Sequence, residues 1–443
     1  MKRNLTVCKI NKTENGVNLK MKNVIPKYLI TALKKMLHTA KMLLRWLLIA
    51  IFVGVVVGIF STLFAYFLAQ ATIIRKQNPY LIAFLPLAGI VIVFMYSRFK
   101  FKNDKGTNLI ISTVHARSEV PFKMAPLIFV ATVLTHLFGG SAGREGAALQ
   151  FGGSLGNQLG RWLKFDKEGR RVLVMCGMSA AFAAIFGTPI AAALFSIEVV
   201  SVGVMYYAAL IPCVFSAVIA SRFPLLLGIT PERYCIEKLD FSILPILAII
   251  LLALCCAGLS VFFCICLHKG ANLLQKIFKN AYVRIFISGL LIVLLTWILN
   301  TTDYNGAGND IIAQAIEGNV VPYAFILKII FTVLTMSSGY KGGEIVPSFF
   351  IGATFGCLFG QICGISPSLC AAVGMISLFC GVTNCPITAL LMSFELFGSE
   401  NALYFIIAIT LSYFMSGYYG LYHAQTIVYS KYHMKFLNRQ AHK

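Results

Sequence analysis

The chain has 443 residues, of which 58% are hydrophobic and 12% are charged, and its mean hydropathy is +0.80. A soluble globular protein carries about 25% charged residues, so this composition excludes an ordinary soluble domain and indicates a multi-pass helical protein of the cell membrane. The formal net charge is +22, but no segment offers a domain that could read a nucleic-acid groove, and we expect no nucleic-acid partner.

Basic residues gather at the two ends of the chain. The segment 1–45 carries eleven lysines and arginines before the first long apolar run, and the segment 431–443 carries four more. By the positive-inside rule, both termini are predicted to be cytoplasmic. The first segment is too long and too basic for a cleaved signal peptide. Its residues 27–45 alternate basic and apolar side chains, which is also typical of a helix lying along the inner membrane surface.

Apolar segments recur along the rest of the chain, but several are too short to cross a hydrocarbon core of about 30 Å. Short apolar segments that are interrupted by glycine are typical of helices that end inside the membrane and line a cavity. We therefore predict an all-α polytopic membrane protein with broken and re-entrant helices. The candidate segments are residues 46–71, 81–95, 124–137, 172–200, 205–227, 241–267, 285–299, 323–336, 345–378, 386–397 and 403–413.

A glycine-rich stretch at residues 139–160 separates two of these segments and contains Arg144, Glu145 and Gly146. Glycine lets the backbone bend and approach a small ligand closely. From residue 147 onward the stretch reads as a helix, whose first turn has free N–H groups. One interpretation is an anion site at the start of a broken helix, with Glu145 as its resident negative charge. The other is a short polar hairpin between two spans, and the stretch alone does not separate them.

Cysteine and glycine patterns give no sign of a cofactor. Most of the 13 cysteines lie within apolar segments, where they behave as small hydrophobic residues. Cys264 and Cys266 lack a second pair of ligands at the spacing that zinc requires, and no nucleotide-binding Gly-x4-Gly-Lys-Ser/Thr loop occurs. We therefore expect no metal, no cofactor and no enzymatic activity, and we expect ion or proton gradients to drive any transport.

The chain contains an internal duplication, because three blocks of residues recur in the same order at an offset of about 200 residues. Two homologous halves of a membrane protein are usually related by a pseudo-two-fold axis, often with inverted topology, and share a site near the bilayer midplane. We predict repeats at 46–226 and 241–430, joined by a linker at 227–240 and flanked by the basic segments 1–45 and 431–443. The helix starts expected to converge lie near Gly106, Gly146, Gly343 and Tyr422. The matched positions are Asn108/Asn309, Gly143/Gly343, Gly152/Gly352, Gly156/Gly356, Gly160/Gly360, Gly177/Gly374, Pro189/Pro386 and Glu198/Glu395.

Three of these motifs resemble those of the CLC family of anion channels and proton-coupled antiporters. Residues 143–146 (Gly-Arg-Glu-Gly) are similar to its Gly-Arg/Lys-Glu-Gly-Pro signature. Residues 342–347 (Gly-Gly-Glu-Ile-Val-Pro) resemble its Gly-Gly-x-Phe-x-Pro segment, and residues 186–189 (Phe-Gly-Thr-Pro) its Phe-Asn-x-Pro segment. The resemblance spans about residues 46–429. It implies the CLC-type inverted repeat, anion transport, and a homodimer in which each subunit has its own anion pathway.

Departures from the common pattern point to one branch of this family. Ordinary CLC chloride proteins carry Gly-Ser-Gly-Ile-Pro where this chain has Gly-Thr-Asn-Leu-Ile at residues 106–110, and phenylalanine where it has Ile345, here preceded by Glu344. Both changes resemble the fluoride-transporting branch. The cytoplasmic proton-relay glutamate of chloride antiporters aligns with Val199, and its absence fits the same branch. Val346 departs from that branch, which has threonine at this position. The part in fluoride handling that is proposed for that threonine therefore does not carry over directly to Val346.

The resemblance implies roles for single residues. Ionised Glu145 would occupy an anion position at the helix start, and protonated Glu145 would leave and carry a proton. Thr107 and Asn108 would offer a hydroxyl, an amide or backbone N–H groups to the ion, because fluoride is strongly hydrated and needs several donors to replace water. Tyr422 matches the central-site tyrosine of the family. The other anion-binding candidates are Arg144, Gly146, Glu344, Ile345 and Val346.

Structural alternatives stand beside two of these roles. Glu145 could form only a loop ion pair with Arg144. Tyr422 has a serious rival interpretation as one of several tyrosines at the membrane interface, because Tyr413, Tyr418 and Tyr419 crowd the same region.

Three further glutamates lie in the duplicated motifs. Glu344 is either a proton-handling group or a loop charge balanced by Lys341, and balance is slightly favoured because a charge in the membrane is expensive unless it is paired or wet. Glu198 and Glu395 occupy equivalent repeat positions, which favours a structural cap or an interhelical contact over proton transfer.

Taken together, the residues predict a proton-coupled fluoride antiporter that exports fluoride from the cytoplasm. The alternative of the same fold is a chloride channel or chloride/proton antiporter. A membrane scaffold that transports nothing is the third hypothesis, and it gives no account of Glu145 beside duplicated glycine loops. The expected partners are fluoride or chloride, protons, the lipid bilayer and a second copy of the chain.

Overall fold

The computed structural model describes residues 24–99, 106–115, 119–239, 242–433 and 435–441. The basic residues predicted at positions 2–22 and at 443 therefore lie outside the described residues, as do residues 240 and 241 at the boundary between linker and second repeat. The chain divides into two compact units, residues 1–48 and residues 49–443. The described part of the first unit is the beginning of helix α1 (Val24–Gln77), and everything that follows concerns the second unit.

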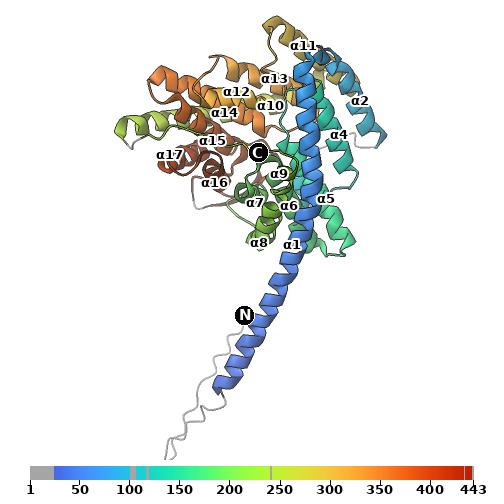
Figure 1. Ribbon diagram of the computed structural model, residues 1–443, viewed down its shortest axis with the longest axis vertical. Coiled ribbons are helices and arrows are strands. Elements are labelled where there is room, and N and C mark those ends of the chain that lie inside the picture. Colours follow the sequence, from blue (N-terminus) through green and yellow to red (C-terminus); the bar gives the residue numbers. More distant parts are fainter. Residues whose placement is uncertain (1–23, 100–105, 116–118, 240–241, 434, 442–443) are drawn as a thin grey trace, which may run out of the picture. The chain divides into compact units, whose positions relative to one another are not determined.

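Apolar helices joined by short turns make up most of the second unit (Figure 1). Seven helices are long and apolar enough to cross a membrane, and six shorter apolar helices have 10 to 17 residues, counted over the described residues. The predicted mixture of complete and short helices is thus confirmed. After α1 the elements are η1 (Pro79–Phe84), α2 (Leu85–Arg98), α3 (Thr107–Val114), α4 (Met124–Leu137), α5 (Glu145–Trp162), α6 (Lys167–Phe186), α7 (Pro189–Glu198), β1 (Ser201–Val202), η2 (Tyr207–Ala209), α8 (Leu210–Ala220), α9 (Phe223–Leu226), α10 (Ile243–Ile277), α11 (Ala281–Leu299), α12 (Asn309–Ile316), α13 (Ala324–Ser338), α14 (Ile345–Cys363), α15 (Pro367–Thr383), α16 (Pro386–Phe397), α17 (Ala402–Met415), β2 (Thr426–Tyr429) and β3 (Phe436–Gln440).

Two predicted segments are each broken into two helices. Residues 172–200 form the end of α6 and all of α7, and residues 345–378 form α14 and the start of α15. α6 ends at Gly187 and α14 at Gly364, both in the left-handed region with φ of 71° and 67°. Pro189 and Pro367 then begin the next helices. A left-handed glycine after one helix and a proline at the start of the next are strong helix boundaries, but the apolar composition continues across both of them.

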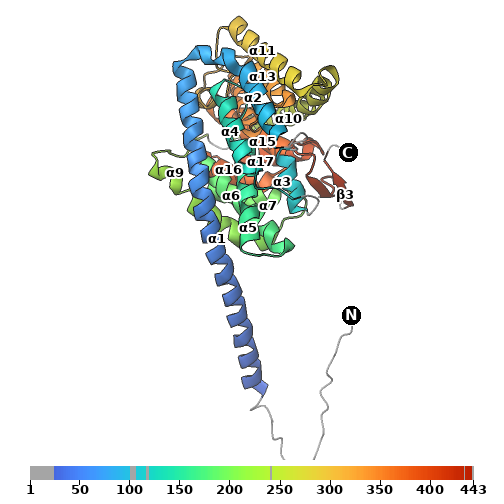
Figure 2. The same ribbon diagram turned by 90° about the vertical axis from the view of Figure 1, so that its right-hand side faces the viewer.

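The two repeats use the same close helix packing. α5 lies against α6, and α14 lies against α15. At Gly156 an added Cβ would overlap the carbonyl oxygen of Leu173, and at Gly356 it would overlap that of Cys370. Only glycine allows the helix backbones to approach so closely. Figures 1 and 2 show α5–α7 in the lower part of the second unit and the second-repeat helices α13 and α15 above them.

A small three-stranded sheet was not predicted. β1 pairs in parallel with β2, and β2 pairs in antiparallel with β3. Val202, Ile427 and Ala441 form its buried apolar cluster. The sheet therefore ties the segment after α7 in the first repeat to the C-terminal segment, whose basic tail forms a strand.

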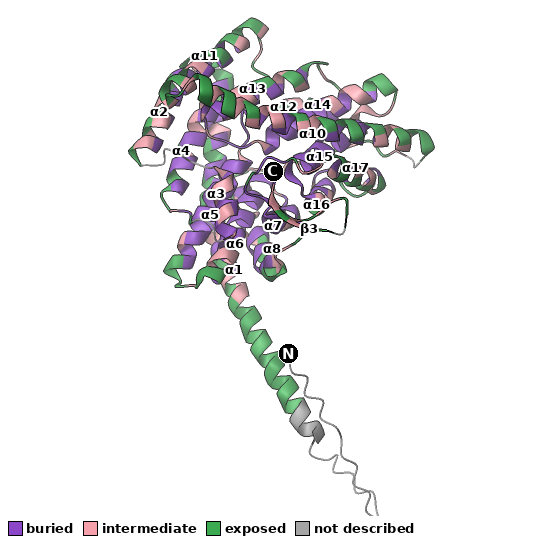
Figure 3. Ribbon diagram, turned by 180° about the vertical axis from the view of Figure 1, so that it is seen from behind, coloured by how far each residue is buried: buried purple, intermediate pink, exposed green. Residues whose placement is uncertain are grey.

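Burial separates an inner group of helices from an outer one (Figure 3). α5, α6, α14 and α15 are largely buried. The outer helices α2, α10, α11 and α17 expose large apolar side chains, as expected for surfaces that face lipid. Examples are Leu87, Phe94, Leu251, Leu290, Trp297 and Leu403.

Candidate functional site

The glycine loops of the two repeats meet at a single point. The backbone N–H of Gly143 donates to the carbonyl of Gly343 at 2.7 Å, and the N–H of Gly343 donates back to Gly143 at 2.8 Å. The two residues form an isolated antiparallel bridge. A Cβ at Gly343 would overlap the backbone nitrogen of Gly146, so the contact requires glycine. The predicted convergence of the loops near Gly146 and Gly343 is therefore observed.

Glu145 lies where these loops meet, at the first position of α5. Its side chain is fully buried, and its Oε2 accepts a hydrogen bond of 2.9 Å from the backbone N–H of Arg144. Its Oε1 has no hydrogen-bond partner among the described residues. A Cβ at Gly143 would overlap Glu145 Oε2 and would lie 3.1 Å from Cβ of Val346. The carboxylate of the first repeat is thus held against the second.

Backbone N–H groups at the starts of three helices are candidate donors to an anion. No side-chain hydrogen bond caps α3, α5 or α14 in the described structure. The first N–H groups of a helix have no partner within the helix, and together with the helix dipole they favour an anion. Gly106 precedes α3 with a φ of 55°, a conformation that glycine adopts without strain.

Thr107 and Gly146 are in direct contact. The Thr107 hydroxyl donates to the Gly146 carbonyl at 3.3 Å and accepts from Gln150 Nε2 at 3.3 Å. Gln150 is buried, and its Oε1 has no hydrogen-bond partner among the described residues. Gln150 is a site residue that the sequence did not single out. Its spacing of four residues from Gly146, on the same helix face, was the available signal.

Asn108 and Tyr422 belong to one corner of the site. Asn108 Oδ1 accepts a hydrogen bond of 2.9 Å from the backbone N–H of Ala424, so its amide positions the C-terminal segment. Tyr422 is 2% exposed, and its hydroxyl has no hydrogen-bond partner among the described residues. No helix begins at Tyr422, contrary to expectation, because the chain turns there and continues into β2.

Residues 344–346 form the start of α14. Ile345 and Val346 are buried, whereas Glu344 is partly exposed and precedes the helix without capping it. The ammonium of Lys341 lies 4.4 Å from the ring centroid of Tyr96. A Cβ at Gly143 would meet both Glu145 Oε2 and Val346 Cβ, so Val346 lies near the carboxylate of Glu145. The two interpretations of Glu344 both stay open.

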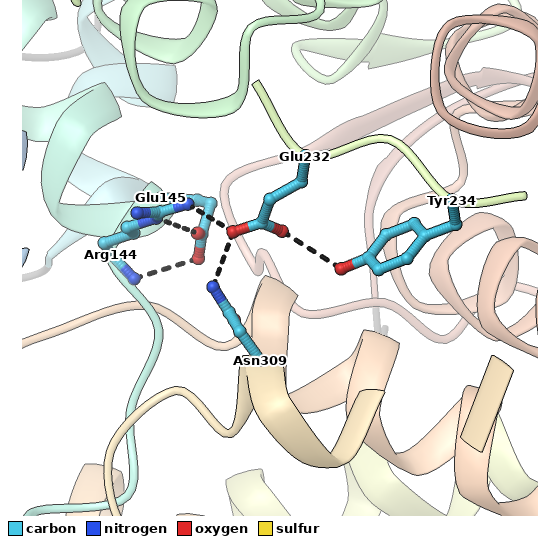
Figure 4. A network of polar contacts seen from close by, with 5 residues as sticks. All are labelled: Arg144, Glu145, Glu232, Tyr234 and Asn309. Carbon is cyan, nitrogen blue, oxygen red and sulfur yellow. Dashed lines mark hydrogen bonds and ion pairs between the residues drawn. The ribbon is translucent and has the colours of Figure 1, made fainter. Parts of the chain in front are cut away.

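A polar network that the sequence did not indicate surrounds Arg144 (Figure 4). Arg144 Nη2 donates to Glu232 Oε1 at 2.9 Å, and Asn309 Nδ2 donates to the same oxygen at 2.6 Å. The hydroxyl of Tyr234 donates to Glu232 Oε2 at 3.2 Å. Burial and the adjacent Glu232 carboxylate raise the pKa of the Tyr234 phenol above its usual value, so this hydroxyl keeps its proton. The guanidinium of Arg144 is thus engaged by carboxylates, although the sequence suggested that it contacts the anion.

A cavity of about 580 Å³ lies beside this network. Arg144 and Asn309 line it together with His136 and with residues at the end of α1. His136 Nε2 is buried and has no hydrogen-bond partner within the part of the chain that the structure describes. No cluster of three His, Cys, Asp or Glu that could hold a metal is found among the described residues.

The sequence of the chain is similar to that of known proteins of one family. Residues 88–417 match the family described as voltage gated chloride channel. A chloride/fluoride channel protein of Pseudomonas syringae pv. tomato is 36% identical over 397 residues, which cover 88% of each chain. The H(+)/Cl(-) exchange transporter ClcA of Yersinia pestis is 26% identical over 395 residues, 82% of each chain.

Two solved structures share the fold. A CLC-type fluoride/proton antiporter superposes with a TM-score of 0.83 and 33% identity, over 86% of this chain and 98% of the other. A slow cyanobacterial Cl⁻/H⁺ antiporter superposes with a TM-score of 0.72 and 20% identity, over 84% and 94% of the two chains. The second similarity concerns the fold alone.

Proposed function

The chain belongs to the voltage-gated chloride channel (CLC) family, as its motifs predicted, and we propose that it is a proton-coupled antiporter that exports fluoride from the cytoplasm. It is a multi-pass membrane protein with the predicted CLC fold. The similarity to a fluoride/proton antiporter over 86% of the chain supports this function. The segment Gly-Thr-Asn-Leu-Ile at 106–110 and the pair Glu344–Ile345 resemble the same branch.

One observation carries the proposal: the buried carboxylate of Glu145 lies at the start of α5, against the loop of the second repeat. It binds a backbone N–H group that an anion could use. When Glu145 is protonated, it loses the charge that favours this position, and fluoride can replace it while the side chain carries the proton. This exchange would couple fluoride movement to proton movement in the opposite direction.

Fluoride needs several donors to replace its hydration shell. Backbone N–H groups at the starts of α3, α5 and α14 are candidate donors, and those that the Glu145 carboxylate occupies would become donors to the ion once it leaves. The Tyr422 hydroxyl, buried and without a partner among the described residues, is a further candidate donor. Thr107 would contribute through its hydroxyl at the contact with Gly146.

Chloride transport is the second candidate, and Val346 is the observation that favours it. Its apolar side chain stands beside Glu145 where the fluoride branch has threonine. A pathway with one hydroxyl fewer suits a larger and less strongly hydrated anion better.

Efflux from proteoliposomes tests both candidates. Vesicles loaded with fluoride or chloride are monitored with ion-selective and pH electrodes. We expect fluoride to leave at least tenfold faster than chloride and protons to move in the opposite direction. Glu145→Gln should abolish proton movement, whereas Glu168→Gln, at an exposed surface glutamate, serves as the matched control and should change nothing. Equal fluoride and chloride rates would favour the second candidate, and unchanged proton flux in Glu145→Gln would remove Glu145 from the mechanism.

We further propose that both termini are cytoplasmic and that the chain forms a homodimer. The basic residues of 1–45 and 431–443 support the first point. Reporter fusions at each terminus in cells, and the mass of the purified protein in lipid nanodiscs, test the two statements separately.

A further inference from the structure

The segment between the two repeats brings a second carboxylate beside Glu145, the residue that acts as the gate of the anion pathway in the proposed function. Glu232 contacts Arg144 in the first glycine loop at 2.9 Å and Asn309 at the start of α12 at 2.6 Å. Figure 4 shows the Glu232 carboxylate beside that of Glu145, with the guanidinium of Arg144 next to both. The side chain of Glu232 is 31% exposed, whereas that of Glu145 is fully buried. Glu232 is therefore the carboxylate of this pair that is in contact with solvent.

The ion pair between Arg144 and Glu145 is incomplete. Arg144 Nε lies 3.6 Å from Glu145 Oε1, beyond a normal hydrogen bond of about 2.9 Å. Both atoms are buried and have no hydrogen-bond partner among the described residues. Arg144 instead places Nη2 on Glu232. Glu232 thus holds the Arg144 guanidinium close enough to Glu145 for an electrostatic interaction, but the guanidinium forms no hydrogen bond to the Glu145 carboxylate.

The internal symmetry places Glu232 opposite the Tyr422 corner. Asn108 and Asn309 are equivalent in the two repeats. Asn108 binds the backbone of Ala424, near the end of the second repeat. Asn309 binds Glu232, in the segment that follows the first repeat. The equivalent asparagines of the two repeats thus each bind a segment at or just after the end of the other repeat, one with the Tyr422 hydroxyl and the other with the Glu232 carboxylate.

We propose that Glu232 is a positioning residue for the gate: its carboxylate holds Arg144 away from Glu145, and loss of that carboxylate lets Arg144 pair with Glu145 and keep the gate closed. The inference rests on the proposed function and adds a residue that controls where Arg144 lies at that same site. Two carboxylates compete for one guanidinium, and a paired Arg–carboxylate fork is stronger than a single charged contact.

Other charges around Glu232 are accounted for by the same geometry. Asp310, next to Asn309 on α12, is paired with Lys76 of α1. Arg144 and Glu145 lie beside Glu232 in the first glycine loop. The Tyr234 hydroxyl donates a hydrogen bond to Glu232 from the same linker segment. Of these groups, Arg144 alone contacts both carboxylates by an ion pair in the described structure.

The test compares fluoride/proton exchange of the full-length protein in proteoliposomes from pH 5.5 to 8. Glu232→Gln removes the charge and keeps the shape of the side chain. We expect turnover at pH 7 to fall about fivefold, and the pH profile to shift by about one unit towards acid, because a nearby opposite charge moves a titration by about 1–3 units. The KM for fluoride should change less than turnover. Glu232→Asp keeps the charge and should restore most of the profile.

Controls separate this effect from misfolding and from failure of the proposed function. Glu237→Gln, an exposed glutamate of the same segment, should match the unmodified protein. Tyr234→Phe removes one donor from Glu232 and keeps the stacking on Phe397 at 5.8 Å, so it should give a smaller acid shift even if Glu232→Gln does not fold. An unchanged pH profile in the folded variants overturns the inference, whereas absence of fluoride/proton exchange in the unmodified protein overturns the proposed function instead.

Discussion

Glu198 and Glu395 cap each other's helices across the internal symmetry. Glu198, at the end of α7, accepts from the backbone N–H groups of Ile387 and Thr388 at 3.1 and 2.8 Å, at the start of α16. Glu395, near the end of α16, accepts from Ile190 and Ala191 at 3.0 and 2.9 Å, at the start of α7. The structure thus confirms that these glutamates are caps between helices.

Removing either cap should therefore affect stability. Glu395→Ala leaves two N–H groups at the start of α7 without their acceptor, and the loss of such a cap costs about 1–2 kcal/mol. We expect a lower thermal midpoint in detergent and an unaltered ratio of protons to fluoride. A change of that ratio, measured with pH and fluoride electrodes, would instead give Glu395 a part in proton transfer.

The glycines at the helix contacts should tolerate no side chain. In Gly356→Ala the new Cβ would overlap the Cys370 carbonyl oxygen of α15, so α14 and α15 must separate. We expect little folded protein by size-exclusion chromatography. Gly258→Ala in α10 is the matched control, because nothing lies within 4 Å of its added Cβ, and alanine there should stabilise the helix by up to about 1 kcal/mol.

This packing could be predicted from sequence, whereas the polar network around Arg144 could not. The repeated glycines mark a backbone contact that depends on local spacing, and the same offset placed Gly143 opposite Gly343. Glu232 lies 88 residues from Arg144, and a charge in a linker is ordinarily solvated. Only the folded chain shows that Asn309 and Arg144 both reach it.

Helix breaks and the small sheet were missed for a related reason. Hydropathy remains high through Gly187 and Gly364, so the apolar segments looked continuous although the backbone turns there. β1 has two residues, and its partner strand β2 lies more than 200 positions later in the chain. Neither has the length or the alternation by which a strand is predicted from sequence.

Val346→Thr tests whether the apolar side chain beside Glu145 limits fluoride selectivity. Threonine has nearly the same shape and adds one hydroxyl donor near the carboxylate. A hydrogen bond contributes about 1 kcal/mol, so we expect the fluoride-to-chloride rate ratio to rise about fivefold. Val373→Thr, on the buried helix α15 away from the loops, should not raise it. An unchanged ratio in Val346→Thr would place this residue outside the ion's path.

Tyr422→Phe tests the buried hydroxyl that has no partner among the described residues. The change breaks no hydrogen bond described in the structure, so the thermal midpoint should stay the same while the KM for fluoride rises several-fold. Tyr418→Phe is the contrasting variant, because the Tyr418 hydroxyl is 2.6 Å from Ser430 Oγ. It should lower the thermal midpoint and leave the KM unchanged.

Lys431 makes stability depend on pH in the C-terminal segment. Burial lowers the pKa of its ammonium from 10.5 to about 8, although Asn384 Oδ1 and the Tyr413 carbonyl accept hydrogen bonds from it at 2.6 and 2.8 Å. Between about pH 8 and 10.5 the unfolded chain holds this proton more tightly than the folded protein does, so the free energy of unfolding rises with pH across that window. The gain is up to roughly 3 kcal/mol, since one pKa unit corresponds to about 1.4 kcal/mol. Lys431→Arg keeps its charge throughout this range, so the thermal midpoint of the unmodified protein should rise relative to that of the variant from pH 8 to 10. Parallel curves for the two proteins would contradict this assignment.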